Sequence, residues 1–446
     1  MPDDAAHAAT PDPRAQRRAD ILAWLAFLAL AIGFSTPPIL TALKRPLGNK
    51  DYSLWQETGQ RILHAQPLYP TDGAAAFPYM YPPTPAILLY APLSILPAPL
   101  FVASLAILSS IAWAAALHLG VFLATGKAFR QHPLLYALPL GITAFYAWDT
   151  YLLGQVNIIL LALMLGAFAL IRGKRPILGG SLIALAASIK AFPIMAIGWI
   201  VWRREWRALA GLIGGLVLLL IAIPGAFRGF AFNLAELRTW LGGMLLNTGG
   251  DTLAQRSSIA FTYKNQALYA VAHRLLRPLP AGWMDDDTAT YTVNLLNLSP
   301  AAATAAAAIL ALALCLLYVR SMPAKARRTR ETDSLEWSAL LILIALFTPL
   351  AWTYTMIALM PAYAAGIAFA LRRSPGSRER RAAIAALSFA TLLLSASLSQ
   401  PWDHTTQALG LTMWGALTLA VTMCWMMLRE KAASSTPTTS IPMPAR

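Results

Sequence analysis

The chain has 446 residues, of which 57% are hydrophobic and 12% are charged, and its mean hydropathy is +0.56. Because a soluble globular protein has about 25% charged residues, this composition excludes an ordinary soluble enzyme. The formal net charge of +15 comes mostly from short Lys and Arg clusters between apolar runs, which is typical of membrane-protein loops. We therefore expect membrane lipids around the chain and no nucleic acid as a partner.

The two ends of the chain are polar. Residues 1–19 are rich in proline and alanine and end in Arg17 and Arg18, directly before the apolar run 21–43. This run exceeds the ~7–15 apolar residues of a cleaved signal peptide, so we expect it to remain as the first membrane helix. We expect residues 1–20 to be a disordered cytoplasmic N-terminus and the Ser-, Thr- and Pro-rich residues 431–446 to be a disordered cytoplasmic tail.

Residues 21–430 form the expected transmembrane domain, because apolar runs near the ~20 residues of a membrane helix recur throughout it. Basic clusters mark the cytoplasmic side at Arg14–Arg18, Lys127–Arg130, Arg172–Arg175, Arg203–Arg207, Lys325–Arg330, Arg372–Arg381 and Arg429–Lys431. The expected crossings are 21–43, 84–122, 133–149, 156–171, 177–189, 191–202, 207–224, 301–319, 335–350, 352–371, 382–399 and 407–428. The expected fold is thus all-α, a polytopic membrane helix bundle of about twelve helices with external interfacial helices and both termini cytoplasmic.

Two parts of this arrangement are unusual. The run 84–122 is too long for one upright helix and contains Pro92, Pro97 and Pro99, so its first part is expected to be tilted or re-entrant. The short runs on either side of "SIKAFP" place Lys190 at the external face. Four larger segments also lie outside: loop 44–83, the turn "WDTYLLGQ", the large loop 225–300 and the turn "SQPWDHTTQ". Any chemistry is therefore expected to face outward.

The first external loop gathers Asp51, Tyr52 and Trp55, and Tyr81 follows in "PYMYPPTP". If 51–64 is a helix, Asp51 and Trp55 share one face. A carboxylate beside aromatic rings suits an acceptor hydroxyl that needs a base and a sugar that needs a stacking surface. The alternative is an interfacial anchor helix whose carboxylates face water, and periodicity alone favours this alternative.

Three polar side chains stand at the outer ends of later helices. Gln155 and Asn157 in "YLLGQVN" can hydrogen-bond sugar hydroxyls or cap the helix that they begin, and this segment taken alone favours capping. Lys190 lies between apolar segments and needs a polar environment. It can bind a phosphate as a point charge or extend to lipid headgroups, and the residues alone leave both open.

The large external loop contains "AQRSSIAFTYKNQALYAVAHRLL", in which an amphipathic helix follows Asn265 and Gln266. Its basic side chains, Arg256, Lys264 and Arg274, suit a lipid-linked phosphate. The acidic run at 284–287 is of the kind that water usually solvates, so no metal site is expected.

Known cofactor motifs are missing from the sequence. There is no Walker loop, dinucleotide fingerprint, nucleophile elbow or zinc-spaced His pair. The two cysteines, Cys315 and Cys424, lie within apolar runs and predict neither a disulfide framework nor a thiolate metal site. We expect no cofactor and no cytosolic nucleotide as a direct donor.

Three segments together resemble glycosyltransferase family 87, which includes polyprenol-phosphate-mannose-dependent alpha-mannosyltransferases. They are "YPPTPAILLYAPLSILP", "GQVNIILLALMLGAFALIRGKRPILGGSLIALAASIKAFPI" and "KNQALYAVAHRLL". The resemblance implies a GT-C fold in a bacterial inner membrane, with the active site on the outer, periplasmic face. It also implies transfer of a hexosyl group, mannosyl by default, from a polyprenyl-phosphate sugar to a lipid or glycan hydroxyl.

The resemblance also implies roles for individual residues. Asp51 matches the catalytic base, which takes a proton from the acceptor hydroxyl in one inverting displacement. Lys190 matches a lysine near the donor phosphate. The pairs Gln155 with Asn157 and Asn265 with Gln266 match positions that are structural or substrate-positioning. In "TPLAWTYT" the chain departs from its relatives, which often have a His where Tyr354 and Thr355 stand, and Tyr354 is a candidate to hydrogen-bond in its place.

Two other functions fit parts of the sequence. A transporter or flippase of lipid-linked sugars would use Lys190 to line a path across the membrane, but it predicts polar residues through the bilayer midplane rather than at the helix ends. A non-catalytic scaffold predicts no loss from Asp51→Asn beyond its effect on folding.

Overall fold

The computed structural model describes residues 13–45, 49–69, 78–128, 132–246, 248–249, 252–253, 260–282 and 291–433. This part of the chain is almost entirely helical, and its only strands are the two-residue antiparallel pair β1 (Thr248–Gly249) and β2 (Thr252–Leu253). Six of the described helices are long and apolar enough to cross a membrane: Ile21–Lys44, Ala98–Thr125, Trp206–Arg228, Pro300–Ser321, Thr353–Arg372 and Leu411–Ala433. The protein is a polytopic helical membrane protein, as the sequence predicts.

The long helices follow the predicted crossings in order. They are α1 (Pro13–Lys44), α5 (Ala98–Thr125), α6 (Leu134–Leu153), α7 (Asn157–Arg172), α8 (Pro176–Ile189), α9 (Ala196–Trp202), α10 (Trp206–Leu216), α14 (Pro300–Ser321), α15 (Arg330–Phe347), α16 (Met360–Arg372), α17 (Arg378–Ala396) and α19 (Leu411–Ala433). Short helical segments continue three of them: η2 (Phe192–Met195) leads into α9, η3 (Val217–Ala222) follows α10, and η6 (Thr353–Leu359) leads into α16. The separate turn η5 (Lys325–Arg327) lies between α14 and α15. The total of about twelve crossings stays a prediction, because several of these helices are shorter or less apolar than a lone span requires.

The long apolar run 84–122 is divided where its prolines predict a break. It begins as α3 (Pro83–Pro85), η1 (Ala86–Tyr90) and α4 (Ala91–Ser94), and α5 starts only after Pro97. Pro97 has extended backbone, with ψ 148°, and a proline has no N–H to continue a helix. The first part is therefore a separate short helical segment.

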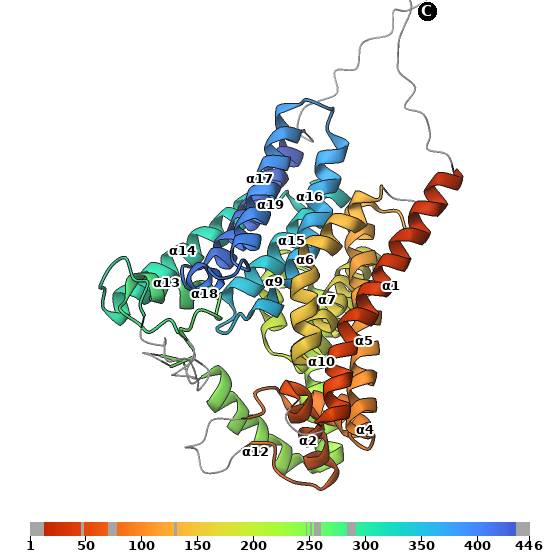
Figure 1. The fold of residues 1–446 in the computed structure, drawn as a ribbon, viewed down its shortest axis with the longest axis vertical. Helices are drawn as coiled ribbons and strands as arrows, with labels where there is room; N and C mark the ends of the chain where they lie inside the picture. The colour runs from red at the N-terminus through yellow and green to blue at the C-terminus, as the bar shows by residue number, and fades with distance from the viewer. Residues whose placement is uncertain are drawn as a thin grey trace, which may run out of the picture.

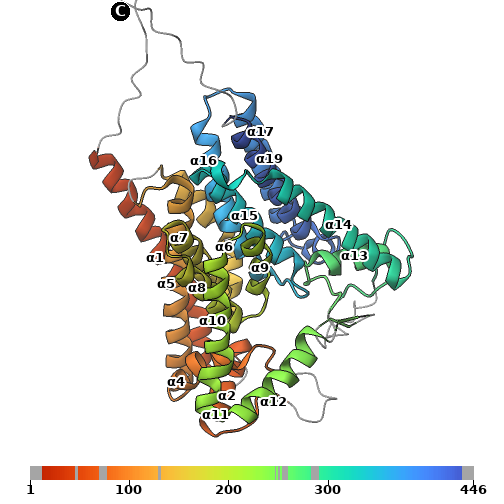
Figure 2. The ribbon, with the colours of Figure 1, turned by 180° about the vertical axis from the view of Figure 1, so that it is seen from behind.

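The basic clusters gather at one end of the bundle, which we call the basic end. Figures 1 and 2 show α1 beginning at this end, where α16 also finishes and α17 starts. The guanidinium of Arg172 lies 2.8 Å from Asp333, and Lys325 lies 3.3 Å from Glu205. Within the described residues, the clusters that the sequence assigns to one side of the membrane are thus on one side of the molecule.

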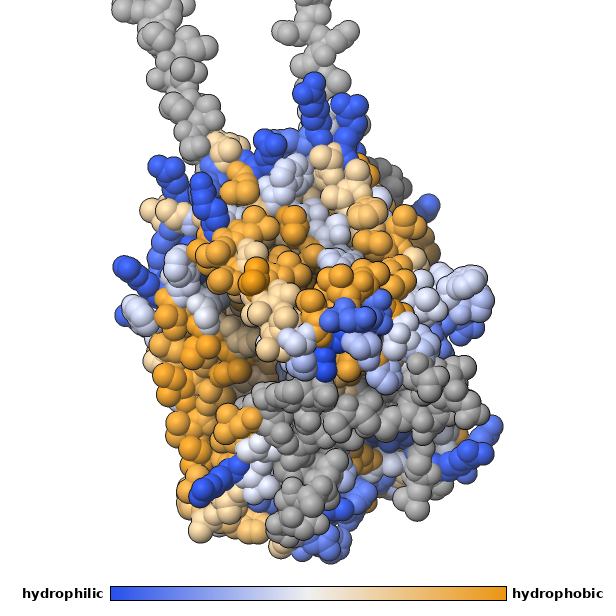
Figure 3. Space-filling view, turned by 90° about the vertical axis from the view of Figure 1, so that its left-hand side faces the viewer, coloured by the Kyte–Doolittle hydropathy of each residue, from blue (hydrophilic) through white to orange (hydrophobic). Residues whose placement is uncertain are grey.

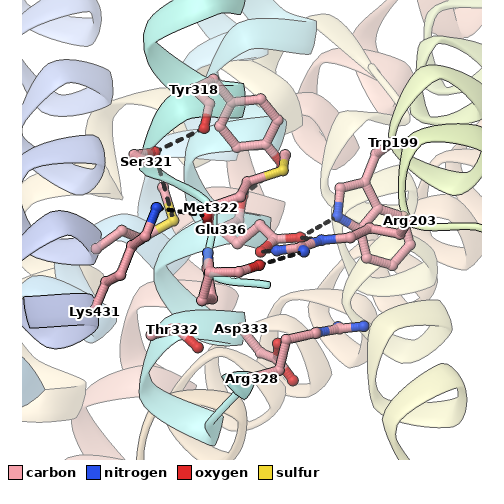
Figure 4. A network of polar contacts seen from close by, with 12 residues as sticks. Trp199, Arg203, Tyr318, Ser321, Met322, Arg328, Thr332, Asp333, Glu336 and Lys431 are labelled. Atoms are coloured by element: carbon pink, nitrogen blue, oxygen red, sulfur yellow. Dashed lines mark hydrogen bonds and ion pairs between the residues drawn. The ribbon is translucent and has the colours of Figure 1, made fainter. Parts of the chain in front are cut away.

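A buried ion pair holds this end together (Figure 4). Arg203 at the end of α9 bonds to Glu336 on α15, and the Trp199 indole donates to the same carboxylate at 2.5 Å. Arg328 pairs with Asp333 at 2.7 Å. Because both members of the Arg203–Glu336 pair are buried, removal of one leaves the other charge uncompensated.

The surface of the bundle suits a lipid environment. Large apolar side chains of α1 and α14 are exposed, among them Leu22, Ile32, Ile309 and Leu312. In the view of Figure 3, hydrophobic residues cover much of the face and hydrophilic residues gather toward its upper and lower ends. By contrast, α15 and α16 are buried along almost their whole length. They form the centre around which the other helices pack.

Short helices lie at the opposite end, which we call the site end. They are α2 (Lys50–Leu63), α11 (Ile223–Arg228), α12 (Phe230–Trp240) with η4 (Leu241–Leu245), α13 (Leu268–Leu276) and α18 (Asp403–Ala408). Figure 1 shows α2, α4 and α12 together beyond the lower ends of α1 and α5. The predicted helices at 51–64 and after Asn265 are both present.

We expect Glu336→Ala to lower the stability of the folded protein strongly. Loss of one partner of a buried ion pair costs about 3–5 kcal/mol, and the Glu336 side chain has 0% exposure. Thermal unfolding in detergent measures the effect. Glu57→Ala is the matched control, because Glu57 pairs with Arg61 while 59% exposed, and exposed pairs contribute less than about 1 kcal/mol. Equal unfolding temperatures for the two variants would contradict this assignment.

Candidate functional site

Two hydrogen bonds fix α2 against the end of α6. The Tyr52 hydroxyl donates to the carbonyl oxygen of Tyr151 at 2.7 Å, and the Trp55 indole N–H donates to the carbonyl oxygen of Gly154 at 2.7 Å. Both rings are buried, and Trp55 stacks on Tyr90 with 5.3 Å between ring centroids. Neither ring has a free face for a sugar in this structure. Their effect is to set the position of Asp51, which lies on the same helix.

Gly154 makes this contact possible. It ends α6 in the left-handed conformation, with φ +78°, which glycine adopts without steric cost. A Cβ atom at this position would lie 2.8 Å from the Tyr52 ring. The glycine of "GQVN" thus allows both the turn into α7 and the close approach of α2.

The Gln155 side chain joins three groups from different parts of the chain. Its Nε2 donates to the Asp51 carboxylate, and its Oε1 accepts from the Tyr81 hydroxyl at 3.0 Å and from the Lys190 ammonium at 3.3 Å. The donors on Oε1 and the acceptor on Nε2 define the orientation of the amide. Gln155 therefore connects a carboxylate to a cation rather than only capping α7.

Lys190 lies in the break between α8 and η2, outside both helices. Its ammonium donates to the Asn157 Oδ1 at 3.2 Å and lies 5.2 Å from the Tyr81 ring centroid and 5.0 Å from that of Tyr354. Burial lowers the pKa of Lys190 to about 7, although the negative charge of Asp51 acts in the opposite direction. Neutral amides and aromatic faces thus hold this cation, and the site remains suited to an added anion.

Asp149 is a carboxylate in this region that the motif analysis does not single out. It lies on α6 and is partly exposed, and the backbone N–H of Tyr354 donates to it. The charges of Asp51 and Asp149 both act on the Tyr354 phenol. A carboxylate at the end of an apolar run is the signal that could have identified it.

The Asn265 and Gln266 amides bond to backbone groups. The Asn265 amide donates to the carbonyl oxygens of Ala260 and Pro349 and accepts from the N–H groups of Ala267 and Ala351. The Gln266 amide donates to the carbonyl oxygens of Tyr263 and Gln407. Both side chains are buried and bond to backbone. They hold the segment before α13 against the loops that precede η6 and α19.

The basic residues of the large loop have different positions. Arg274 is fully buried and donates to the carbonyl oxygens of Ala408, Thr262 and Asn265, so it supports the backbone and does not present a charge for a phosphate. Lys264 is partly exposed, and its charge acts on Asp149. Arg256 and the acidic run 284–287 lie outside the described residues. Within the described residues, no cluster of three or more His, Cys, Asp or Glu suits a metal ion.

The fold and the site define an integral membrane protein whose polar side chains converge at one end of the helix bundle. A family model describes its class more closely: glycosyltransferase family 87 matches residues 79–330, more than half of the chain. The chain belongs to this family and is a membrane glycosyltransferase. No curated protein and no solved structure matches it. The family match contains Tyr81, Gln155, Asn157 and Lys190, whereas Asp51 lies before it.

We expect Asn265→Ala and Asn157→Ala to differ in their effect on stability. Asn265→Ala leaves four buried backbone groups without their partner, and each such group costs about 1–3 kcal/mol. Asn157 bonds only to side chains, those of Lys190 and Thr355, so its loss should change unfolding far less. Chemical unfolding in detergent compares the two. A less stable Asn157→Ala variant would contradict this division.

Proposed function

We propose that this glycosyltransferase moves a hexosyl group, mannosyl by family resemblance, from a polyprenyl-phosphate sugar to a hydroxyl of a lipid or glycan. The observation that supports the proposal most is the Gln155 amide, which bonds to Asp51 and to Lys190 at once. The Asp51 carboxylate, as the base for the acceptor, and the Lys190 ammonium, as the cation for the donor phosphate, are therefore bridged by a single side chain. The bundle is then of GT-C type.

Asp51 acts as the general base in this mechanism. The acceptor oxygen forms a bond to the anomeric carbon while the bond from that carbon to the phosphate oxygen breaks, and the acceptor proton passes to Asp51. The attack comes from the face opposite the leaving group, so the configuration inverts. Gln155 and the α2–α6 hydrogen bonds hold the carboxylate in place, which is the positioning that such a displacement requires.

Lys190 binds the phosphate of the donor and stabilises the charge that develops on the leaving polyprenyl phosphate. The aromatic rings around it, including Tyr354, exclude water on one side of the ammonium. Tyr354 thus contacts the phosphate-binding lysine at the position where relatives often have a His.

A small apolar hollow lies beside Asn157 and Thr355. It continues along Leu160, Phe192 and Ile344, between α7, η2 and α15, and its volume is about 30 Å³. This space holds one or two water-sized groups and not a chain of isoprene units, so the lipid-linked donor is proposed from the family resemblance.

The direction of the site in the membrane follows from the charge distribution. The basic end carries the clusters that the positive-inside rule assigns to the cytoplasm, and the site is at the other end. This distribution supports an active site on the external face, and the family resemblance suggests that this is the periplasmic face of a bacterial inner membrane. Transport of lipid-linked sugars is the alternative, and membership of a glycosyltransferase family favours transfer over transport.

The direct test is transfer from radiolabelled polyprenyl-phosphate mannose to a membrane lipid extract by purified protein in nanodiscs. We expect Asp51→Asn to slow transfer at least ~100-fold, the usual contribution of a general base. Glu57→Gln is the matched control on the same helix, because Glu57 is exposed and bonds only to Arg61. Equal rates for wild type and Asp51→Asn would exclude the base assignment.

The pH dependence of donor binding tests the role of Lys190. Because the pKa of Lys190 lies at about 7, the ammonium loses its proton as pH rises above that value. We expect the KM for the donor to rise about tenfold per pH unit above this pKa. In Lys190→Arg the rise should disappear, because a guanidinium stays protonated. A wild-type KM that is constant from pH 6 to pH 9 would contradict the assignment.

A further inference from the structure

A buried ion pair joins α11 and α12 to the segment that follows α2. The Glu236 carboxylate accepts the backbone N–H of Leu68 at 2.7 Å, and the Arg228 guanidinium donates to the carbonyl oxygen of Gln66 at 2.7 Å. Arg228 and Glu236 also pair with each other, and both side chains are buried. Figures 1 and 2 show α2 and α12 at the same end of the molecule. Two backbone groups of this segment are therefore fixed to α11 and α12.

The backbone of Tyr81 is fixed on both of its sides. The Trp240 indole N–H, at the end of α12, donates to the carbonyl oxygen of Met80 at 3.0 Å, and the Trp240 side chain is buried. The Tyr69 hydroxyl donates to the carbonyl oxygen of Tyr81 itself at 2.5 Å. Tyr69 directly follows Leu68, the residue that Glu236 holds. One of the two hydrogen bonds thus comes from α12, and the other comes from a segment that α12 fixes.

Tyr81 carries this support into the site. Its hydroxyl donates to the Gln155 Oε1 at 3.0 Å, and its ring centroid lies 5.2 Å from the Lys190 ammonium. Gln155 in turn bonds to Asp51. A shift of the Tyr81 backbone by about 1 Å would break the hydrogen bond to Gln155, and misplacements of that size can slow a positioned reaction about 100-fold.

We propose that α12 is a positioning element of this transferase, and that Trp240 and Tyr69 are positioning residues that act through Tyr81 on Gln155. This inference rests on the proposed function, in which the Gln155 amide holds the base and the phosphate-binding lysine. Neither positioning residue accepts the proton or supplies the cation. Their effect is to keep the phenol of Tyr81 where it orients the amide.

A double-mutant cycle separates positioning from a general effect on folding. Trp240→Phe keeps an aromatic ring and removes the indole N–H, whereas Tyr81→Phe removes the hydroxyl that reaches Gln155. The measurement is kcat/KM for transfer from polyprenyl-phosphate mannose to a membrane lipid extract, by the full chain in nanodiscs, per mole of folded protein.

We expect Tyr81→Phe to lower kcat/KM about tenfold and Trp240→Phe to lower it about fivefold, the size expected for the loss of one hydrogen bond. Because Trp240 acts through Tyr81, the double variant should lose about tenfold and not about fiftyfold. A purely structural role of Trp240 would instead multiply the two losses, since it does not depend on the Tyr81 hydroxyl.

Tyr69→Phe closes a second cycle with Tyr81→Phe and does not depend on the folding of Trp240→Phe. It removes the other hydrogen bond to the Tyr81 backbone and should show the same lack of additivity. Thr239→Val is the matched control on α12, because the Thr239 hydroxyl is exposed and donates to Ala235 in its own helix. We expect this control to keep the wild-type kcat/KM.

Losses that multiply in both double variants would overturn this inference and leave the proposed function standing. Wild-type values of kcat/KM in both Trp240→Phe and Tyr69→Phe would do the same. A wild-type protein that transfers no mannose from this donor would overturn the proposed function, and this inference with it.

Discussion

The amide of Gln155 is the contact on which the site depends. Asp51, Tyr81 and Lys190 come from three separate parts of the chain, and all three bond to this one side chain. An amide is suited to the place because it presents a donor to the carboxylate and an acceptor to the ammonium. A glutamate would repel Asp51, and an apolar residue would leave Lys190 without one of its two amide oxygens. The bridge holds the Asp51 carboxylate and the Lys190 ammonium near each other through an amide rather than through a direct ion pair.

The rest of the fold positions this contact. The left-handed turn at Gly154 lets α7 begin at Asn157 and lets the Tyr52 ring lie against the turn. The buried Asn265 and Gln266 amides hold the segment that carries Lys264. At the other end of the bundle, the Arg203–Glu336 pair joins α9 to α15.

Much of the fold could be predicted from the sequence because membrane helices need long apolar runs and basic loops, and both are local patterns. The break at Pro97 and the unusual position of Lys190 follow from the same reasoning. Asp51 was predicted as a site residue because it matches the catalytic base of the family that the sequence resembles. Whether the Gln155 and Asn265 amides serve a substrate or the backbone could not be predicted, because their partners lie far away along the chain. Gln155 and Asp51 are 104 positions apart.

Two features of the site could not be predicted from the sequence, for related reasons. Tyr52 and Trp55 are residues of the kind found at membrane interfaces and at sugar-stacking surfaces. Only the packing of α2 on α6 shows that their polar atoms donate hydrogen bonds to backbone carbonyl oxygens. Asp149 belongs to a turn whose sequence suggested an external loop, and its proximity to Tyr354 depends on the fold of η6. Periodicity describes which residues share a face of one helix, but it does not describe which helix that face meets.

The most direct measurement is a structure of the protein in nanodiscs with a non-hydrolysable phosphonate analogue of polyprenyl-phosphate mannose. Our account predicts phosphonate oxygens within hydrogen-bonding distance of the Lys190 ammonium and the anomeric carbon facing Asp51. A phosphonate bound elsewhere, with Lys190 still held only by Gln155 and Asn157, would contradict it.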